Sequence, residues 1–221
     1  MSDTSEMHET VSAEQQSEPK KKTTLLQDLL DIIESAITSV FLVLLLFAFL
    51  LRPVTVEGSS MNPTLYNQDK LLMMSLFYTP KAGDVVIING DHANLFTDAS
   101  QTTVTESKGM EIRLVKRVIA VSGQELDIDF ETGTVTVDGE VRNEPYIADL
   151  TTRNDGAFAY PLTIPEGYVF VMGDNRLHST DSRNSAVGLV SEEQVMGRAI
   201  LRFSRDDALC TTWFDQFAIL N

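Results

Sequence analysis

The sequence predicts a mostly β protein that carries a single N-terminal transmembrane helix. Two observations support this fold class. An uncharged apolar stretch covers residues 35–51, and the chain after it contains short segments rich in β-branched residues, separated by Gly, Asp, Asn and Pro. With 221 residues, the chain is long enough for one sizeable domain beside that helix.

The N-terminal segment has two parts. Residues 1–19 are polar, contain no Lys or Arg and lack an apolar period, which predicts a disordered tail. After the lysines at 20–22, residues 24–33 place apolar pairs at helical spacing. We therefore assign residues 1–34 to a cytoplasmic tail with an amphipathic lead-in.

Residues 35–52 form the predicted transmembrane helix. Its 17 uncharged residues would span about 26 Å as a helix, near the lower limit for crossing a bilayer. Arg52 and Pro53 end the apolar run. A cleaved secretory signal is disfavoured because no small-residue cleavage site follows, and a buried core helix would seldom be so uniformly apolar. The three lysines before the span predict a cytoplasmic N-terminus and an external segment 53–221.

Composition excludes several classes of function. The formal net charge is −15, so the surface should repel nucleic acid. The only cysteine, Cys210, rules out an intramolecular disulfide, and three histidines occur without metal-ligand spacing. We therefore expect no metal, no cofactor and no nucleic-acid partner.

The external segment should consist mainly of short strands. We expect strands at residues 54–56, 84–88, 113–121, 134–137 and 168–172. Asp138-Gly139 between two apolar runs is typical of a hairpin turn. Residues 89–110 are polar and predict a long exposed loop that is nearly strandless.

Ser60 is the first candidate catalytic residue. It lies in Gly58-Ser59-Ser60-Met61-Asn62-Pro63-Thr64-Leu65, directly after the first expected strand. Gly58 permits unusual backbone angles and Pro63 stiffens the turn, so the serine hydroxyl can be presented beside backbone N–H groups. Taken alone, however, these residue types favour an ordinary Ser-rich turn.

Lys116 is the second candidate. In a strand it shares a face with Leu114 and Val118, and Arg117 points to the other face. A lysine on an apolar face is unusual, and loss of solvation would lower its pKa towards that of a general base. A lysine that extends to solvent at a sheet edge is the alternative.

The third candidate is the dense polar run at residues 173–185, which we call the polar shelf. Nearly every residue in it is a glycine or can form a hydrogen bond through its side chain. Such a run can place Ser179 beside a buried amine, with Asp181 and Arg183 fixing the backbone. A Ser-His-Asp triad with His178 is disfavoured because side chains this close in sequence rarely converge in triad geometry.

Together, these three segments resemble the type I signal peptidases, which are Ser/Lys proteases of bacterial membranes. Ser60-Met61-x-Pro63-Thr64-Leu65 is similar to the nucleophile box, and Lys116-Arg117-Val118 to the general-base box. Gly173-Asp174-Asn175-Arg176, with Ser179, Asp181, Ser182 and Arg183, is similar to the third box, and Gly83-Asp84-Val85-Val86 to a structural box. The resemblance covers about residues 36–204 and is closer to the single-span, Gram-positive form.

The resemblance implies a role for each matching residue. Ser60 would attack the scissile carbonyl and Lys116 would take its proton. The Ser60 N–H would stabilise the oxyanion together with position 58; because Gly58 has no side chain, its contribution would come from the backbone or be absent. Ser179 would orient the lysine, and Asp181 and Arg183 would hold the shelf. Shallow apolar pockets would accept small substrate side chains; their expected lining is Val54, Val56, Met61, Leu65 and Val115.

The resemblance also implies a domain plan and partners. The catalytic β domain would comprise residues 53–129 and 164–208, with a small β insert at 130–163 and a C-terminal tail at 209–221. The partners would be signal-peptide-bearing preproteins and the lipid bilayer. An extended substrate would add a strand beside residues 54–56.

Two other classes remain open at this stage. Leu209-Cys210-Thr211 superficially suggests a sortase-like cysteine transpeptidase, although no histidine is arranged around Cys210. An N-anchored extracellular β domain without protease activity would make the lysine and the polar shelf structural.

Overall fold

The computed structural model describes residues 25–76, 78–205, 210 and 212–220. The expected disordered tail at 1–19 and the lysines at 20–22 lie outside the described residues. The chain forms two compact units, residues 1–43 and 44–221, each considered by itself below.

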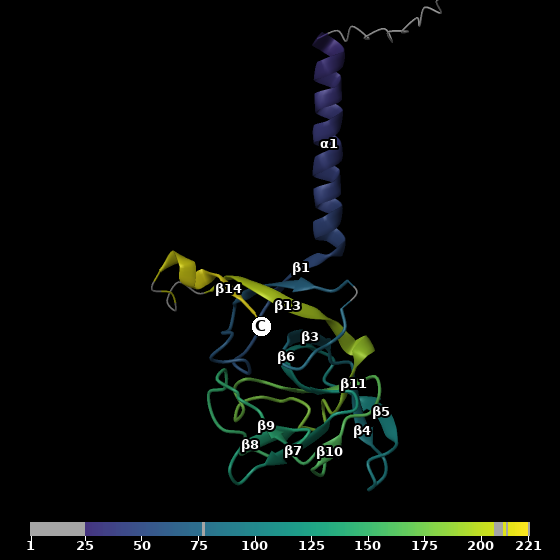
Figure 1. Ribbon diagram of the computed structural model, residues 1–221, viewed down its shortest axis with the longest axis vertical. Helices are drawn as coiled ribbons and strands as arrows, with labels where there is room; N and C mark the ends of the chain where they lie inside the picture. The colour runs from purple at the N-terminus through teal and green to yellow at the C-terminus, as the bar shows by residue number, and fades with distance from the viewer. Residues whose placement is uncertain (1–24, 77, 206–209, 211, 221) are drawn as a thin grey trace, which may run out of the picture. The chain divides into compact units, whose positions relative to one another are not determined.

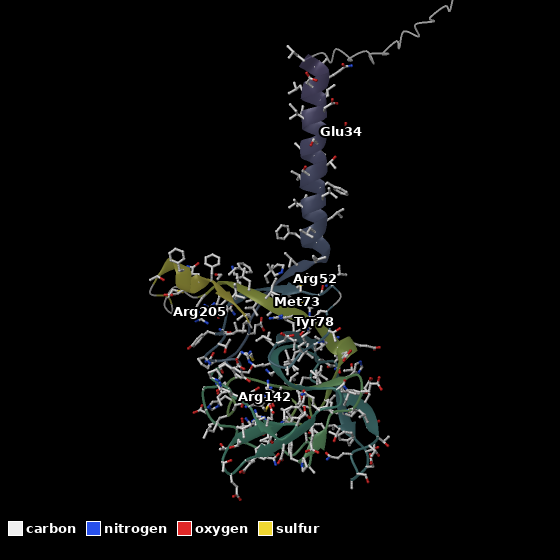
Figure 2. All side chains as sticks on the ribbon, in the orientation of Figure 1. Glu34, Arg52, Met73, Tyr78, Arg142 and Arg205 are labelled. Atoms are coloured by element: carbon white, nitrogen blue, oxygen red, sulfur yellow. The ribbon has the colours of Figure 1, made fainter. Side chains whose placement is uncertain are left out.

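Helix α1 covers Leu25–Phe49 and includes both the predicted lead-in and most of the predicted transmembrane segment. Residues 25–48 are long and apolar enough to cross a membrane, and none of the most apolar window is buried against protein. Figure 2 shows its side chains projecting outward all round, with Glu34 among them. The helix ends before Arg52 and Pro53, which instead belong to the first strand.

The remaining chain is mostly β, as predicted. Its strands are β1 (Leu51–Thr55), β2 (Lys70–Met74), β3 (Val85–Asn89), β4 (His92–Phe96), β5 (Val104–Lys108), β6 (Arg113–Val121), β7 (Glu125–Asp129), β8 (Thr134–Val137), β9 (Glu140–Val141), β10 (Leu162–Thr163), β11 (Tyr168–Met172), β12 (Val190–Ser191), β13 (Val195–Ser204) and β14 (Ala218–Ile219). Short 3₁₀ helices η1 (Glu192–Gln194) and η3 (Trp213–Gln216) accompany them.

The main sheet has the order β1-β2-β13-β3-β6-β11-β12, with β14 paired to β13. Strand β6 changes partner along its length, because residues 113–117 pair with β3 and residues 117–121 pair with β11. Within the described residues, the segment 113–116 therefore pairs on one side only, as does β1 at the end of the sheet order. These two half-paired segments reappear as walls of the candidate site.

A smaller sheet, β10-β7-β8-β9, lies at the end of this unit away from β1 and β14 (Figure 1). The first strand of this small sheet, β7, starts at Glu125, before the predicted start of the insert at residue 130. Leu126 and Ile128 alternate with exposed residues and pack with Val135 and Val137, which draws β7 into the small sheet. The predicted hairpin turn is present, with positive φ at both Asp138 and Gly139.

The expectation of a strandless loop at 89–110 was wrong. Strands β4 and β5 form a two-stranded antiparallel hairpin there. Asn94 lies buried in β4 and donates from its side chain to Leu189 O and Gln194 Oε1. Tertiary hydrogen bonds therefore hold a polar segment whose β propensity is low.

The C-terminal residues are more than a tail. β14 pairs with β13 through Leu201–Ile219 and Arg202–Ala218, and Leu220 is buried. Leu220 joins the cluster that contains Met61, Leu65 and Met73, directly beneath the segment carrying Ser60. Met73 is labelled within this part of the unit in Figure 2.

Candidate active site

Ser60 lies in the turn that follows β1, and the polar shelf holds this turn from behind. The backbone N–H of Asn175 donates to Ser60 O at 3.0 Å, and the Asn175 side chain donates to Ser59 O at 3.1 Å. Gly173 approaches equally closely, because a Cβ at that position would collide with Ser60 O and Ser179 Oγ. The shelf therefore fixes the backbone of Ser60 by direct contact.

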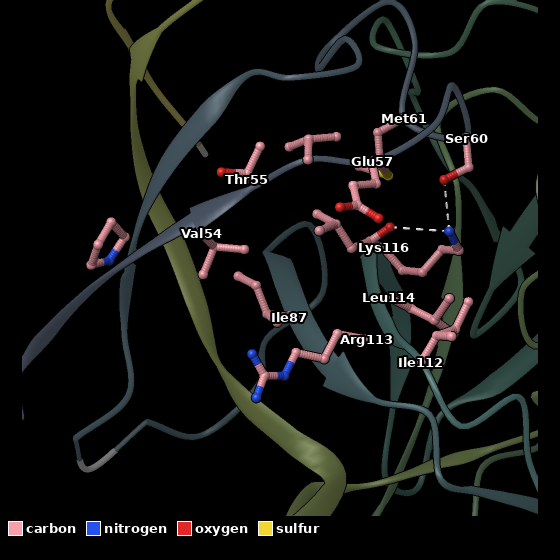
Figure 3. A pocket seen from close by; sticks show the side chains of 13 residues that line it. Val54, Thr55, Glu57, Ser60, Met61, Ile87, Ile112, Arg113, Leu114 and Lys116 are labelled. Atoms are coloured by element: carbon pink, nitrogen blue, oxygen red, sulfur yellow. Dashed lines mark hydrogen bonds between the residues drawn. The ribbon is translucent and has the colours of Figure 1, made fainter.

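Lys116 reaches Ser60 from β6. Its Nζ lies 2.8 Å from Ser60 Oγ and 3.1 Å from Val115 O, and the side chain is 2% exposed (Figure 3). Leu114 and Val118 are buried with it on the expected face. The structure thus brings together two residues that are 56 positions apart in sequence.

Burial changes the chemistry of this amine. Loss of solvation lowers the pKa of Lys116 from 10.5 to about 8, opposed by the negative charges of Asp181 and Asp174 and assisted by the positive charge of Arg183. About a tenth of the amine is then neutral at pH 7 and half at pH 8. A neutral amine at 2.8 Å from a hydroxyl is placed to accept its proton.

A cavity of about 530 Å³ opens beside these two residues (Figure 3). Its lining comes from β1, the Ser60 turn, β3, the first half of β6 and the residue before it: Pro53, Val54, Thr55, Val56, Glu57, Ser60, Met61, Ile87, Ile112, Arg113, Leu114, Val115 and Lys116. Four of the five predicted pocket residues are in this set. Leu65 is not, because it is fully buried in the core beneath Met61.

At Gly58, the backbone donor is already in use, which corresponds to the second of the two expected outcomes. Its φ of 89° lies in the left-handed region that favours glycine. Its N–H donates to Asn67 Oδ1 at 2.9 Å, so this donor is already engaged. By contrast, the Ser60 N–H bonds no acceptor in the part of the chain that the structure describes.

The polar shelf contains the predicted pair of Asp181 and Arg183. They form an ion pair at 2.9 Å with both side chains fully buried. Burial would raise the pKa of Asp181, but the hydrogen bonds and charge of Arg183 and the Gly173 N–H hold it below its ordinary value. Asp181 Oδ2 accepts that N–H at 3.0 Å, which ties the pair to the glycine facing Ser60.

Ser179 does not make the contact that was expected of it. Its hydroxyl is buried and lies near the Asp181 carboxylate, whose pKa it helps to lower, but it does not bond Lys116, whose Nζ bonds Ser60 and Val115 instead. Ser179 nevertheless lies at the site, against the position where a Gly173 side chain would be.

Sequence reasoning missed a second network around the same turn. Arg117 donates from Nε and Nη2 to both carboxylate oxygens of Asp174, and the Thr64 hydroxyl donates to the same carboxylate. Arg176 forms a second buried pair with Glu144 of the insert, at 2.6 Å. The motifs contained Arg117, Asp174 and Arg176, but no pattern in the sequence singled out Glu144 as a partner.

Other reactive residues lie apart from this arrangement. His178 is exposed at the edge of the shelf, and Cys210 is a partly exposed free thiol. Among the described residues, no group of three or more His, Cys, Asp or Glu could hold a metal ion.

Comparison with known proteins gives this arrangement a family context. The family model described as signal peptidase, peptidase S26, matches residues 29–204. Signal peptidase I of Bacillus licheniformis is 34% identical over 188 residues, covering 80% of this chain and 90% of the relative. Signal peptidase I of Bacillus amyloliquefaciens is 36% identical over 174 residues, covering 74% of this chain and 79% of the relative.

One more distant relative and one solved structure were also found. A probable signal peptidase I of Mycobacterium leprae is 32% identical and covers 76% of this chain and 66% of the relative. A crystal structure of a signal peptidase I from Enterococcus faecalis aligns with a TM-score of 0.40 and 24% identity, covering 55% of this chain and 97% of that chain. From the family match and the Bacillus relatives, the chain belongs to the signal peptidase family, peptidase S26, and is a serine peptidase.

Proposed function

We propose that this protein is a membrane-anchored endopeptidase that removes signal peptides from exported preproteins, with Ser60 as nucleophile and Lys116 as general base. The observation that carries the proposal is the 2.8 Å contact between Lys116 Nζ and Ser60 Oγ at a buried amine whose pKa is about 8. Both residues line the largely apolar cavity described above, which we call the groove. Similarity to proteins named signal peptidase I supports the choice of substrate.

The reaction follows from this geometry. Ser60 Oγ bonds to the scissile carbonyl carbon as its proton passes to Lys116 Nζ, and the carbonyl oxygen becomes an oxyanion. The free Ser60 N–H is the donor placed to stabilise this oxyanion, since Gly58 N–H is held by Asn67. Breaking the C–N bond releases the amine, which takes the proton from Lys116. A water, deprotonated in turn by Lys116, then attacks the acyl carbon, and Ser60 Oγ leaves as it takes that proton back from Lys116.

The substrate is expected to bind as an extended strand. Residues 113–116 and β1 each have one edge that pairs with no other described strand, and both flank the groove. A strand between them would gain main-chain hydrogen bonds on both sides. Alternate substrate side chains would then face the apolar walls formed by Val54, Val56, Met61 and Val115, which suits small residues at the first and third positions before the cut.

The anchor fits the same function. Helix α1 is long and apolar enough to span a bilayer, and the lysines that precede it favour a cytoplasmic N-terminus. Ser60 follows Leu51 by nine residues, so the active site would act close to the external membrane surface. Substrates tethered in the same membrane would meet it at high effective concentration.

Replacement of the nucleophile tests the proposal. The Ser60→Ala variant, purified in detergent, should lose cleavage of a preprotein by a factor on the order of 10³ or more while its thermal unfolding stays near that of the parent. A serine-directed acylating inhibitor should label the parent at Ser60 and leave the variant unlabelled. Full processing by Ser60→Ala would contradict the assignment.

A further inference from the structure

The groove carries two opposite charges that the proposed chemistry does not use. Glu57 and Arg113 both line the cavity, both are exposed, and neither forms an ion pair or side-chain hydrogen bond with another described residue. Apart from Lys116, they are the charged members of an otherwise largely apolar lining. Figure 3 shows Glu57 on the side of the pocket near Ser60 and Lys116, and Arg113 farther from Ser60.

This unpaired state is unusual for the charged residues near this site. Arg117, Arg176 and Arg183 are each buried against a carboxylate. Asp84, in the turn leading into β3, pairs with Arg198. Charges left free on the walls of a peptide groove are available to the peptide itself.

Strand geometry indicates which substrate residues they would meet. Arg113 precedes Lys116 by three residues, or about 10 Å along β6. We take the first residue before the cut to lie beside Lys116, with the N-terminal side of the peptide towards Arg113. Arg113 then lies beside the fourth residue before the cut. Glu57 lies three residues before Ser60 and follows Val56, whose side chain packs into the core.

Alternation along the bound strand supports the same assignment. If the first and third residues before the cut face the apolar walls, the second and fourth face outward, as does the first residue after the cut. Outward side chains meet the rim, where Glu57 and Arg113 are exposed.

We infer that Glu57 and Arg113 are specificity-determining residues that read substrate charge at the outward-facing positions. Glu57 favours a basic residue, and disfavours an acidic one, at the second position before the cut and the first after it. Arg113 favours an acidic residue at the fourth position before the cut. The inference rests on the proposed function, because it assumes that the groove holds a substrate peptide with its N-terminal side towards Arg113 and the scissile bond at Ser60.

The test uses the full chain in detergent and peptides that carry Ala at the first and third positions before the cut. Gln, Lys or Glu is placed in turn at each outward position, and kcat/KM is measured for each peptide. Exposed ion pairs are weak, so each favourable charge should raise kcat/KM about two- to five-fold over Gln. The preference should shrink as salt rises, because screening weakens exposed pairs.

Charge variants identify the residue responsible. Glu57→Gln should abolish the preference for Lys beside the cut and Glu57→Lys should reverse it, whereas Arg113→Gln should remove only the preference at the fourth position. Glu140→Gln and Lys81→Gln change exposed charges outside the groove and should preserve both preferences. The charges that shift the pKa of Lys116 are Asp181, Asp174 and Arg183, so Glu57→Gln should leave the midpoint of the pH profile in place.

Binding separates this inference from the proposed function. The Ser60→Ala variant should bind the same peptides with the same charge order, measured by fluorescence anisotropy. Active enzyme with equal charge preferences in the parent, Glu57→Gln and Arg113→Gln would overturn the inference and leave the function standing. Charge-ordered binding without any cleavage by the parent would contradict the function and retain the role of the two residues.

Discussion

The groove and the polar shelf, which meet at Ser60, use their polar groups in opposite ways. In the shelf, Arg183 is fully buried against Asp181, and Arg176 is fully buried against Glu144. In the groove, Lys116 is equally buried, but its Nζ bonds only a hydroxyl and a carbonyl in the described part of the chain. A guanidinium paired with a carboxylate keeps its charge, whereas the ammonium of a buried, unpaired lysine loses its proton readily. The difference allows a rigid frame and a reactive amine to lie side by side.

Replacing Lys116 should have the largest effect of the changes that test this difference between the groove and the shelf. Lys116→Met keeps an apolar side chain of similar length in the strand but cannot accept a proton. We expect cleavage to fall by a factor on the order of 10³ or more, with little loss of folding stability. Peptide cleavage and thermal unfolding measure the two effects, with exposed Lys81→Met as the control. Retention of most activity would mean that another group is the base.

Breaking a pair in the shelf should affect stability first. Asp181→Asn leaves the Arg183 guanidinium buried without its carboxylate, so unfolding free energy should fall by about 3–5 kcal/mol. Since the Asp181 charge raises the pKa of Lys116, its removal should also move the pH midpoint of activity lower. Denaturant unfolding and a pH profile test both effects. Asp127→Asn, on the exposed face of β7, should change neither.

The contact between the two regions can be tested at Gly173. A Cβ at this position would collide with Ser60 O and Ser179 Oγ, so Gly173→Ala should force the shelf away from the turn. Overpacking of this kind costs about 1–3 kcal/mol. We expect a larger fall in kcat than in folding stability, because the displacement falls on the nucleophile. Unchanged kcat would show that the close approach is not needed for activity.

Different sequence patterns made the key residues of the groove and of the shelf recognisable. Lys116 was recognisable because a cation in an apolar strand face violates the usual burial pattern. Asp181 and Arg183 were recognisable because they lie two residues apart in a polar run. The β class followed from β-branched segments such as 113–121, whose predicted bounds match β6.

Contacts over long sequence separations were not predictable in this way. Glu144 reaches Arg176 from 32 residues away, and Asn94 supports its strand through Leu189 and Gln194. Such partners depend on how the sheets come together, which local patterns do not encode. For the same reason Leu65 was placed in the pocket although it packs beneath it, and Ser179 was given a bond to Lys116 that the described structure lacks.

The pH dependence of kcat/KM, measured between pH 6 and 10 on a small neutral peptide, tests the central claim most directly. The base is active when neutral, so activity should rise with pH through a single ionisation near 8, the pKa that burial gives Lys116. Because Asp181→Asn should move that midpoint lower, the ionisation can be assigned to the amine. A midpoint near the ordinary histidine value of about 6.5, or one that Asp181→Asn leaves in place, would contradict the assignment of Lys116 as the base.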